Sequence, residues 1–352
     1  MRLTLPLLES LDFFITASEQ QAQFVDRRRV RIYEGDPLLL WRLRPNLRDA
    51  LWDLNLVSTN AQHLRYDRPV GPKPSGTYRI LCVGDSVTFG YRVPLVFPKR
   101  PREYEPSRRS YPALLEQALR AASPGRAIEV IPLAVPGYSS HQGLAWLRRD
   151  IGWLQPDLVI ACFGWNDISR RAVSDRDAMR TDRLSVLARD LVARSQALLH
   201  FRRWLDARRA AKPAEAPSRN IGVMRVSREA YLDNLMAVAA LARSRGARVA
   251  LLGPVYRDRV SYPPEAVDIG AHRAALKSAA QGARIPYLEI PELTESHYPE
   301  NERLFGEHIH PNHRGHRLIA ERLGAFLGRE GLLGDLRPPA PPAETPPAAA
   351  HE

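Results

Sequence analysis

The sequence contains few cysteines, few lysines and no long apolar run. Its 352 residues include only two cysteines, Cys82 and Cys162, each within an apolar segment. Two cysteines cannot form a disulfide framework, so we interpret both as small buried residues. No stretch approaches the roughly 18 apolar residues of a membrane-spanning helix, and residues 1–16 lack the long apolar core of a signal peptide. We therefore expect a cytoplasmic protein without an integral membrane segment; a periplasmic or extracellular location is the alternative.

Lysine contributes little to the positive charge of this chain. The formal net charge is +12, yet only Lys73, Lys99, Lys212 and Lys277 are lysines, and arginines occur in every segment. Such a charge is typical of nucleic-acid-binding proteins, but GC-rich coding explains scattered arginines equally well. No nucleic-acid-binding motif is present, so we expect no nucleic-acid partner.

Hydrophobic residues make up 44% of the chain, enough for a folded core. We divide the chain into an irregular N-terminal extension (1–72), one α/β domain (73–336) and a disordered Pro/Ala-rich tail (337–352). Within the extension, residues 36–45 are compatible with a short edge strand bounded by prolines. The composition leaves the oligomeric state open.

Short apolar segments alternate with helical patterns in the α/β domain. Strands are expected near 80–83, 128–133, 158–163, 248–252 and 287–290, with helices between them. This alternation predicts a parallel five-stranded sheet in a three-layer α/β/α sandwich with flavodoxin-like strand order 2-1-3-4-5.

A helical insertion at 168–226 interrupts this alternation. Leucines between 184 and 205 lie on one face of an expected long helix, with arginines around them. A basic amphipathic helix can bind a membrane or a partner, or pack on the protein with its arginines in solvent. A second basic segment, 93–109, is expected to be a loop.

Polar residues follow several of the predicted strands. Gly84, Asp85 and Ser86 end the first strand, and Gly137 and Asn166 follow the second and third. The carboxyl ends of parallel strands meet at one edge of a sheet, where α/β proteins place their sites. Asp85 and Asp167 are expected to be turn or helix-cap residues. Nucleophilic acyl chemistry needs such a serine, with a base and oxyanion donors nearby.

These motifs, together with Glu307 and the late His310-Pro-Asn, resemble those of the SGNH, or GDSL, hydrolases over residues 79–326. The resemblance implies that Ser86 is the nucleophile and His310 the base. It also implies an oxyanion hole formed by the N–H groups of Ser86 and Gly137 and the amide of Asn166. No cofactor or metal is implied.

Glu307 departs from the family pattern, which has aspartate three residues before the histidine. Glutamate can orient His310 if the backbone lies slightly further away; otherwise Ser86 and His310 form a dyad. A metal site is an alternative for this segment, since Glu307 is close in sequence to four histidines: His308, His310, His313 and His316.

The sequence thus predicts a serine esterase that cleaves an acyl or acetyl ester of a small molecule or glycan through an acyl-enzyme. O-acyl transfer to a glycan or natural-product hydroxyl is the alternative, because the same residues would catalyse it. A non-catalytic protein that binds an anionic partner is a further alternative.

Overall fold

The computed structural model describes residues 32–52, 55–91, 110–171, 173–180, 222–256, 265–295, 304–306 and 309–339. The basic loop expected at 93–109 and the long helix expected within 184–205 lie outside these ranges. Most of the predicted tail also lies outside them. Arg337, at its start, donates its N–H to Ser123 Oγ at 2.8 Å.

A parallel sheet of five strands forms the centre of the domain. The order across the sheet is β11-β10-β7-β5-β6. Read from β6 and numbered by position in the chain, this is 2-1-3-4-5, which confirms the predicted topology. The strands are β5 (Thr77–Gly84), β6 (Ala127–Ala134), β7 (Leu158–Cys162), β10 (Arg248–Leu252) and β11 (Tyr287–Leu288). In this register Gly84 lies opposite both Ala134 and Cys162, so the turns after β5, β6 and β7 begin side by side.

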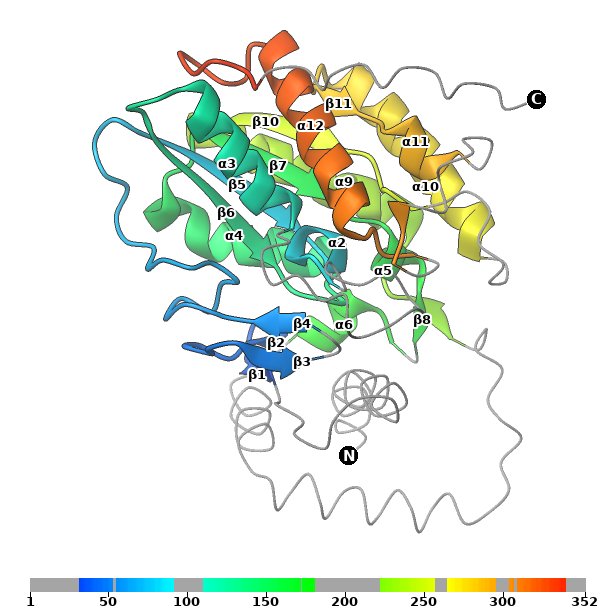
Figure 1. Ribbon diagram of the computed structural model, residues 1–352. Helices are drawn as coiled ribbons and strands as arrows, with labels where there is room; N and C mark the ends of the chain where they lie inside the picture. The colour runs from blue at the N-terminus through cyan, green and yellow to red at the C-terminus, as the bar shows by residue number, and fades with distance from the viewer. Residues whose placement is uncertain are drawn as a thin grey trace, which may run out of the picture.

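Helices cover both faces of the sheet, which confirms the three-layer prediction (Figure 1). One face carries α3 (Tyr111–Ala122) and α12 (His313–Arg329), and the other carries α4 (Ser140–Leu154) and α9 (Arg228–Ser244). The long helix α10 (Glu265–Gly282) and the short α11 (Pro291–Thr294) flank β11 in the chain. No helix in the described ranges combines the length and apolar character needed to cross a membrane.

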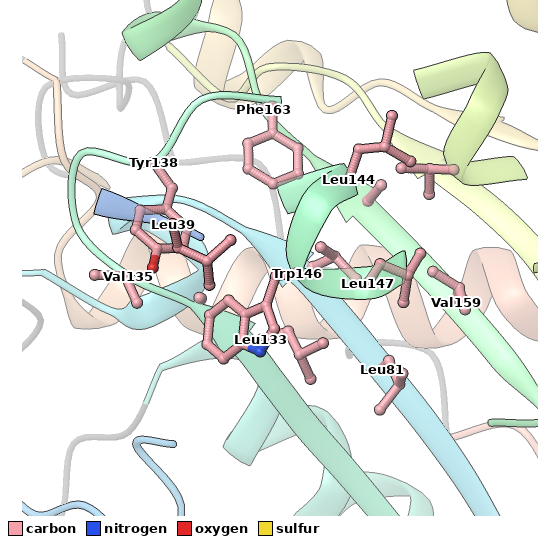
Figure 2. Close-up of a cluster of buried hydrophobic side chains, with 14 of the residues drawn as sticks. Leu39, Leu81, Leu133, Val135, Tyr138, Leu144, Trp146, Leu147, Val159 and Phe163 are labelled. Carbon is pink, nitrogen blue, oxygen red and sulfur yellow. The ribbon is translucent and has the colours of Figure 1, made fainter. Parts of the chain in front are cut away.

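The core on the α4 side is continuous from the sheet to the N-terminal extension. Figure 2 shows Leu81, Leu133 and Val159 from the sheet facing Leu144 and Leu147 of α4. Side chains of the extension and of the turn after β6 belong to the same cluster. Burying one such leucine contributes roughly 1.5–3 kcal/mol, so this cluster ties the extension to the domain.

The described part of the extension is regular, unlike the irregular segment that we predicted. It forms two antiparallel hairpins, β1 (Tyr33–Asp36) with β2 (Leu40–Leu43) and β3 (Ala50–Trp52) with β4 (Asn55–Val57). The short strand expected within residues 36–45 is present as β2, although neither hairpin joins the central sheet. In Figure 1 the hairpins lie at the end of the molecule that also carries α6 and β8.

The two ends of the insertion meet. After α5 (Trp165–Ile168), β8 (Arg170–Arg171) pairs antiparallel with β9 (Val223–Met224), and α6 (Asp175–Met179) follows β8. Both ends of the insertion therefore lie next to the turn that carries Asn166.

Candidate active site

Ser86 begins the short helix α2 (Ser86–Phe89), directly after β5. Gly84 permits this tight turn, because a Cβ at this position would lie 2.0 Å from Thr88 Oγ1 and 2.9 Å from the Cys162 carbonyl oxygen. Asp85 caps the helix by accepting the N–H of Val87 at 3.0 Å, which confirms the expected cap role.

His310 lies against Ser86. Its Nε2 is 2.9 Å from Ser86 Oγ, although the two residues are 224 positions apart in the chain. Only 7% of Ser86 and 8% of His310 are exposed, so the pair is largely shielded from bulk water. This distance lets the imidazole accept the hydroxyl proton, which is the contact that an activated serine needs.

A tight turn before α12 positions His310. Asn312 fixes this turn, because its N–H donates to Leu304 O at 2.8 Å and its amide donates to Phe305 O at 3.0 Å. Asn312 Oδ1 also accepts the N–H groups of Arg314 and Gly315, which begin α12. The Asn of the His-Pro-Asn motif therefore acts on the backbone and holds the histidine loop to the helix.

The turns after β6 and β7 bring Gly137 and Asn166 together. Gly137 has φ +84°, which glycine adopts without strain, and Tyr138 O accepts the side-chain amide of Asn166 at 3.0 Å. The same amide nitrogen is 3.5 Å from Asp85 Oδ2, at the limit of a hydrogen bond. Within the described ranges, no hydrogen bond occupies the N–H of Ser86 or of Gly137.

Asp85 also contacts Tyr256, a residue that the sequence did not single out. The Tyr256 hydroxyl donates to Asp85 Oδ2 at 2.8 Å, and Asp85 is 1% exposed. Burial raises the pKa of Asp85, while hydrogen bonds from Tyr256 and Val87 partly oppose that shift. Its carboxylate is occupied by the cap and by Tyr256, which fits a structural role.

Two further residues near the site were missed because nothing in their sequence context marks them. The ring of Tyr91 lies 4.3 Å from the imidazole of His310, centroid to centroid. Arg65 of the extension donates to the carbonyl oxygens of Phe89 and Gly90 at 2.7 and 2.8 Å, at the C-terminal end of α2. Arginines are frequent in this chain, so one that caps a helix has no distinct signal in the sequence.

Glu307 and His308 lie outside the described residues, so the orienting acid stays a prediction. Of the other residues in the alternative metal site, His316 is fully buried and accepts the N–H of Tyr111 through Nδ1 at 3.2 Å. Among the residues that the structure does describe, no three His, Cys, Asp or Glu side chains are grouped so that they could hold a metal ion.

Comparison with solved structures finds proteins of low sequence identity. A lipase/acylhydrolase from Enterococcus faecalis is 18% identical, with 74% of this chain and 98% of that chain covered and a TM-score of 0.44. Axe2, an acetylxylan esterase from Geobacillus stearothermophilus, is 16% identical, with 71% and 94% covered and a TM-score of 0.45. LAE5, an α/β hydrolase from the metagenome of Lake Arreo, is 18% identical, with 73% and 96% covered and a TM-score of 0.45.

No curated protein matches this sequence. The family model for GDSL-like lipases and acylhydrolases matches residues 82–318, about two thirds of the chain. The matched region runs from the middle of β5, before Ser86, into α12, beyond His310. This chain therefore belongs to the GDSL-like lipase/acylhydrolase family.

Proposed function

We propose that this protein hydrolyses a carboxylic ester through an acyl-enzyme on Ser86. The observation that carries the proposal is the 2.9 Å distance between Ser86 Oγ and His310 Nε2 in a largely buried setting. Membership of an acylhydrolase family supports the same reaction. The substrate that we propose is an ester of a small molecule or a glycan.

In the first step, His310 accepts the Ser86 proton as Oγ attacks the ester carbonyl carbon. The carbonyl oxygen becomes an oxyanion that the N–H groups of Ser86 and Gly137 stabilise, together with the amide of Asn166. The amide N–H that we propose for this role is the one whose contact with Asp85 is long, at 3.5 Å, while the other stays bonded to Tyr138 O. His310 then gives its proton to the departing alkoxide, so the alcohol leaves and the acyl group stays on Ser86.

In the second step, His310 takes a proton from water as the water oxygen attacks the acyl carbon. The second oxyanion occupies the same donors and collapses by breaking the bond to Ser86 Oγ. The proton returns from His310 to Ser86, which releases the carboxylic acid and restores the starting state. The cycle consumes one ester and one water and yields one acid and one alcohol.

Rates of p-nitrophenyl acetate and butyrate hydrolysis test this proposal. Ser86→Ala and His310→Ala should each lose at least about a thousandfold in kcat, since removal of a triad member eliminates most of the catalysis. Ser75→Ala, at an exposed serine in the turn before β5, is the control and should match the wild type. Full activity in Ser86→Ala would contradict the proposal.

Glu307 is the acid that we propose to orient His310, on the family resemblance. Glu307→Gln keeps the shape and removes the charge, so kcat should fall by about tenfold or more if the carboxylate stabilises the imidazolium. An unchanged kcat in this variant, with Ser86 and His310 still essential, would identify a Ser86-His310 dyad instead.

Acyl transfer is the alternative to hydrolysis at the same residues. An acceptor hydroxyl would then replace water in the second step, and His310 would take its proton in the same way. Hydrolysis needs no acceptor site, so it is the simpler proposal. Mass spectrometry of products formed with and without a xylo-oligosaccharide distinguishes the two, because transfer would yield an acylated sugar.

A further inference from the structure

Arg225 lies behind the proposed oxyanion hole and is almost completely buried, with 1% of its side chain exposed. It forms a two-pronged ion pair with Asp175, in which Nε donates to Oδ1 at 2.9 Å and Nη2 to Oδ2 at 2.8 Å. The two partners come from opposite ends of the insertion, Asp175 from α6 and Arg225 from the segment after β9.

The same guanidinium binds the turn that carries Gly137. Its Nη1 donates to the Gly137 carbonyl oxygen at 2.8 Å, and its Nη2 donates to Gln142 Oε1 at 2.9 Å. Gln142 completes the N-terminal cap of α4 with Ser139, two residues beyond Gly137. One rigid side chain thus fixes both the proposed oxyanion turn and the helix that follows it.

Asp175 holds this turn from its other side. The Ser139 hydroxyl donates to Asp175 Oδ2 at 2.5 Å, so the carboxylate contacts the turn directly as well as through Arg225. Burial by itself raises the pKa of Asp175, but the charge and hydrogen bonds of Arg225, with smaller contributions from Ser139 and Arg171, outweigh burial and bring the pKa below its ordinary value. Asp175 therefore stays ionised beside the guanidinium.

The backbone of this segment also supports the Asn166 turn. The N–H of Arg225 donates to Ser169 O at 2.8 Å, and the N–H of Val226 donates to Asp167 O at 3.1 Å. Residues 225–226 therefore contact both turns that supply proposed oxyanion donors. The side chain acts on the first turn and the backbone acts on the second.

We propose that Arg225 is a positioning residue, which with Asp175 holds the Gly137 turn where its N–H can stabilise the oxyanion; this inference rests on the proposed function. Glycine is conformationally free, so the catalytic orientation of its peptide needs an external restraint. A guanidinium supplies that restraint because its fork binds a carboxylate and a carbonyl oxygen at fixed angles.

A positioning role and a purely stabilising role predict different results for a double variant. A buried ion pair costs desolvation energy, and well-packed apolar residues often replace such a pair without loss of stability. The double variant Arg225→Met/Asp175→Leu therefore has no unpaired charge and separates positioning from folding. Arg225→Lys is the milder variant, because lysine keeps the charge but cannot bind Asp175, Gln142 and Gly137 in the same fixed fork.

Arg79 provides a matched control. It is fully buried, pairs with Glu129 at 2.6 Å and donates to Leu154 O at 2.7 Å. It lies near the start of β5, whereas Ser86 follows the end of that strand. Arg79→Met should therefore lower the thermal unfolding midpoint and leave kcat per folded molecule unchanged.

The test measures kcat, KM and inhibition by an alkyl boronic acid, whose tetrahedral adduct with Ser86 resembles the intermediate. In the double variant, kcat and boronate affinity should fall together by roughly 10- to 100-fold, somewhat less than the 10²–10³ for full loss of one oxyanion donor. KM should change less than about twofold, since substrate binding precedes oxyanion formation. The kcat and boronate affinity of Arg225→Lys should lie between those of the double variant and the wild type.

The outcomes that overturn the inference are distinct from failure of the proposed function. A wild type with no Ser86-dependent esterase activity would overturn the proposed function, and this inference with it. An active wild type whose folded Arg225→Lys and double variants keep full kcat and boronate affinity would overturn the positioning role alone. A parallel loss in Arg79→Met would also overturn it, by showing a general effect of removing a buried arginine.

Discussion

The carboxylate of Asp85 and the hydroxyl of Tyr256 form a buried hydrogen bond of 2.8 Å, which joins the nucleophile turn to the chain just beyond β10. The same carboxylate caps α2 at Val87. Asp85 therefore links the turn that carries Ser86 both to α2 and to the chain beyond β10. The position of Ser86 depends on a residue 170 positions further along the chain.

Tyr256→Phe should destabilise the protein by about 1–3 kcal/mol, because it leaves a buried carboxylate without one of its donors. It should also lower kcat several-fold, since Asp85 adjoins both Ser86 and Asn166. Urea unfolding and steady-state kinetics measure the two effects. Tyr78→Phe is the control, because the Tyr78 hydroxyl donates to Leu332 O near the opposite edge of the sheet. An unchanged kcat in Tyr256→Phe would show that this contact serves stability only.

Arg65→Met should lower the free energy of unfolding by about 1.5–3 kcal/mol, because it removes the charged donor that two carbonyl oxygens share at the end of α2. Its guanidinium also lies 4.6 Å above the Phe89 ring, and that contact is lost as well. Arg322→Met is the comparison, since Arg322 pairs with Glu292 at a largely exposed position. Arg322→Met should lower the free energy of unfolding by less than about 1 kcal/mol. Equal losses in the two variants would refute the capping role of Arg65.

Acid should destabilise the protein through His316. Burial, with smaller effects from Arg65, His310 and His313, lowers its pKa from 6.5 to about 3. Between these values the unfolded chain binds a proton that the folded state does not, so stability falls as pH drops from 6.5 toward 3. Taken by itself, the contribution of His316 to this slope should approach about 1.4 kcal/mol per pH unit. His316→Asn keeps an acceptor for Tyr111 and should remove the His316 contribution to the slope, measured by urea titrations at several pH values.

Asp167 should act in the opposite direction. Burial raises its pKa from 3.8 to about 7, against hydrogen bonds from Ser140. In the folded protein Asp167 therefore holds a proton that the unfolded chain releases. Its contribution to the free energy of unfolding falls as pH rises from 3.8 through 7. Between pH 3.8 and 6.5 the contributions of Asp167 and His316 oppose each other, so Asp167→Asn should make stability fall more steeply with acid than in the wild type. The same slope in His316→Asn as in the wild type would contradict this account.

Sequence alone could predict the sheet and the strand ends that carry the site. Each core strand is a short apolar segment followed by a polar turn, so local pattern and topology suffice to bring Ser86, Gly137 and Asn166 to one edge. The approach of His310 to Ser86 followed only from the family resemblance, because contacts between residues so distant in sequence leave no periodic signal.

The N-terminal extension and Arg225 could not be predicted in this way. The hairpins are stabilised by the rest of the protein: Leu39 O accepts the amide of Gln142 at 2.8 Å, and Trp41 O accepts the Tyr138 hydroxyl. Strands this short carry too few residues to show an alternating pattern. Arg225 is one of many arginines near the insertion, and only tertiary structure distinguishes a buried guanidinium from one in solvent.

The central claim is that His310 activates Ser86 as a nucleophile, and intact-mass labelling with a fluorophosphonate at neutral pH tests it most directly. We predict that the wild type gains one phosphonyl adduct on Ser86, that Ser86→Ala gains none, and that labelling of His310→Ala is slower by orders of magnitude. A folded wild type that remains unlabelled, or labelling that persists in Ser86→Ala, would contradict the claim.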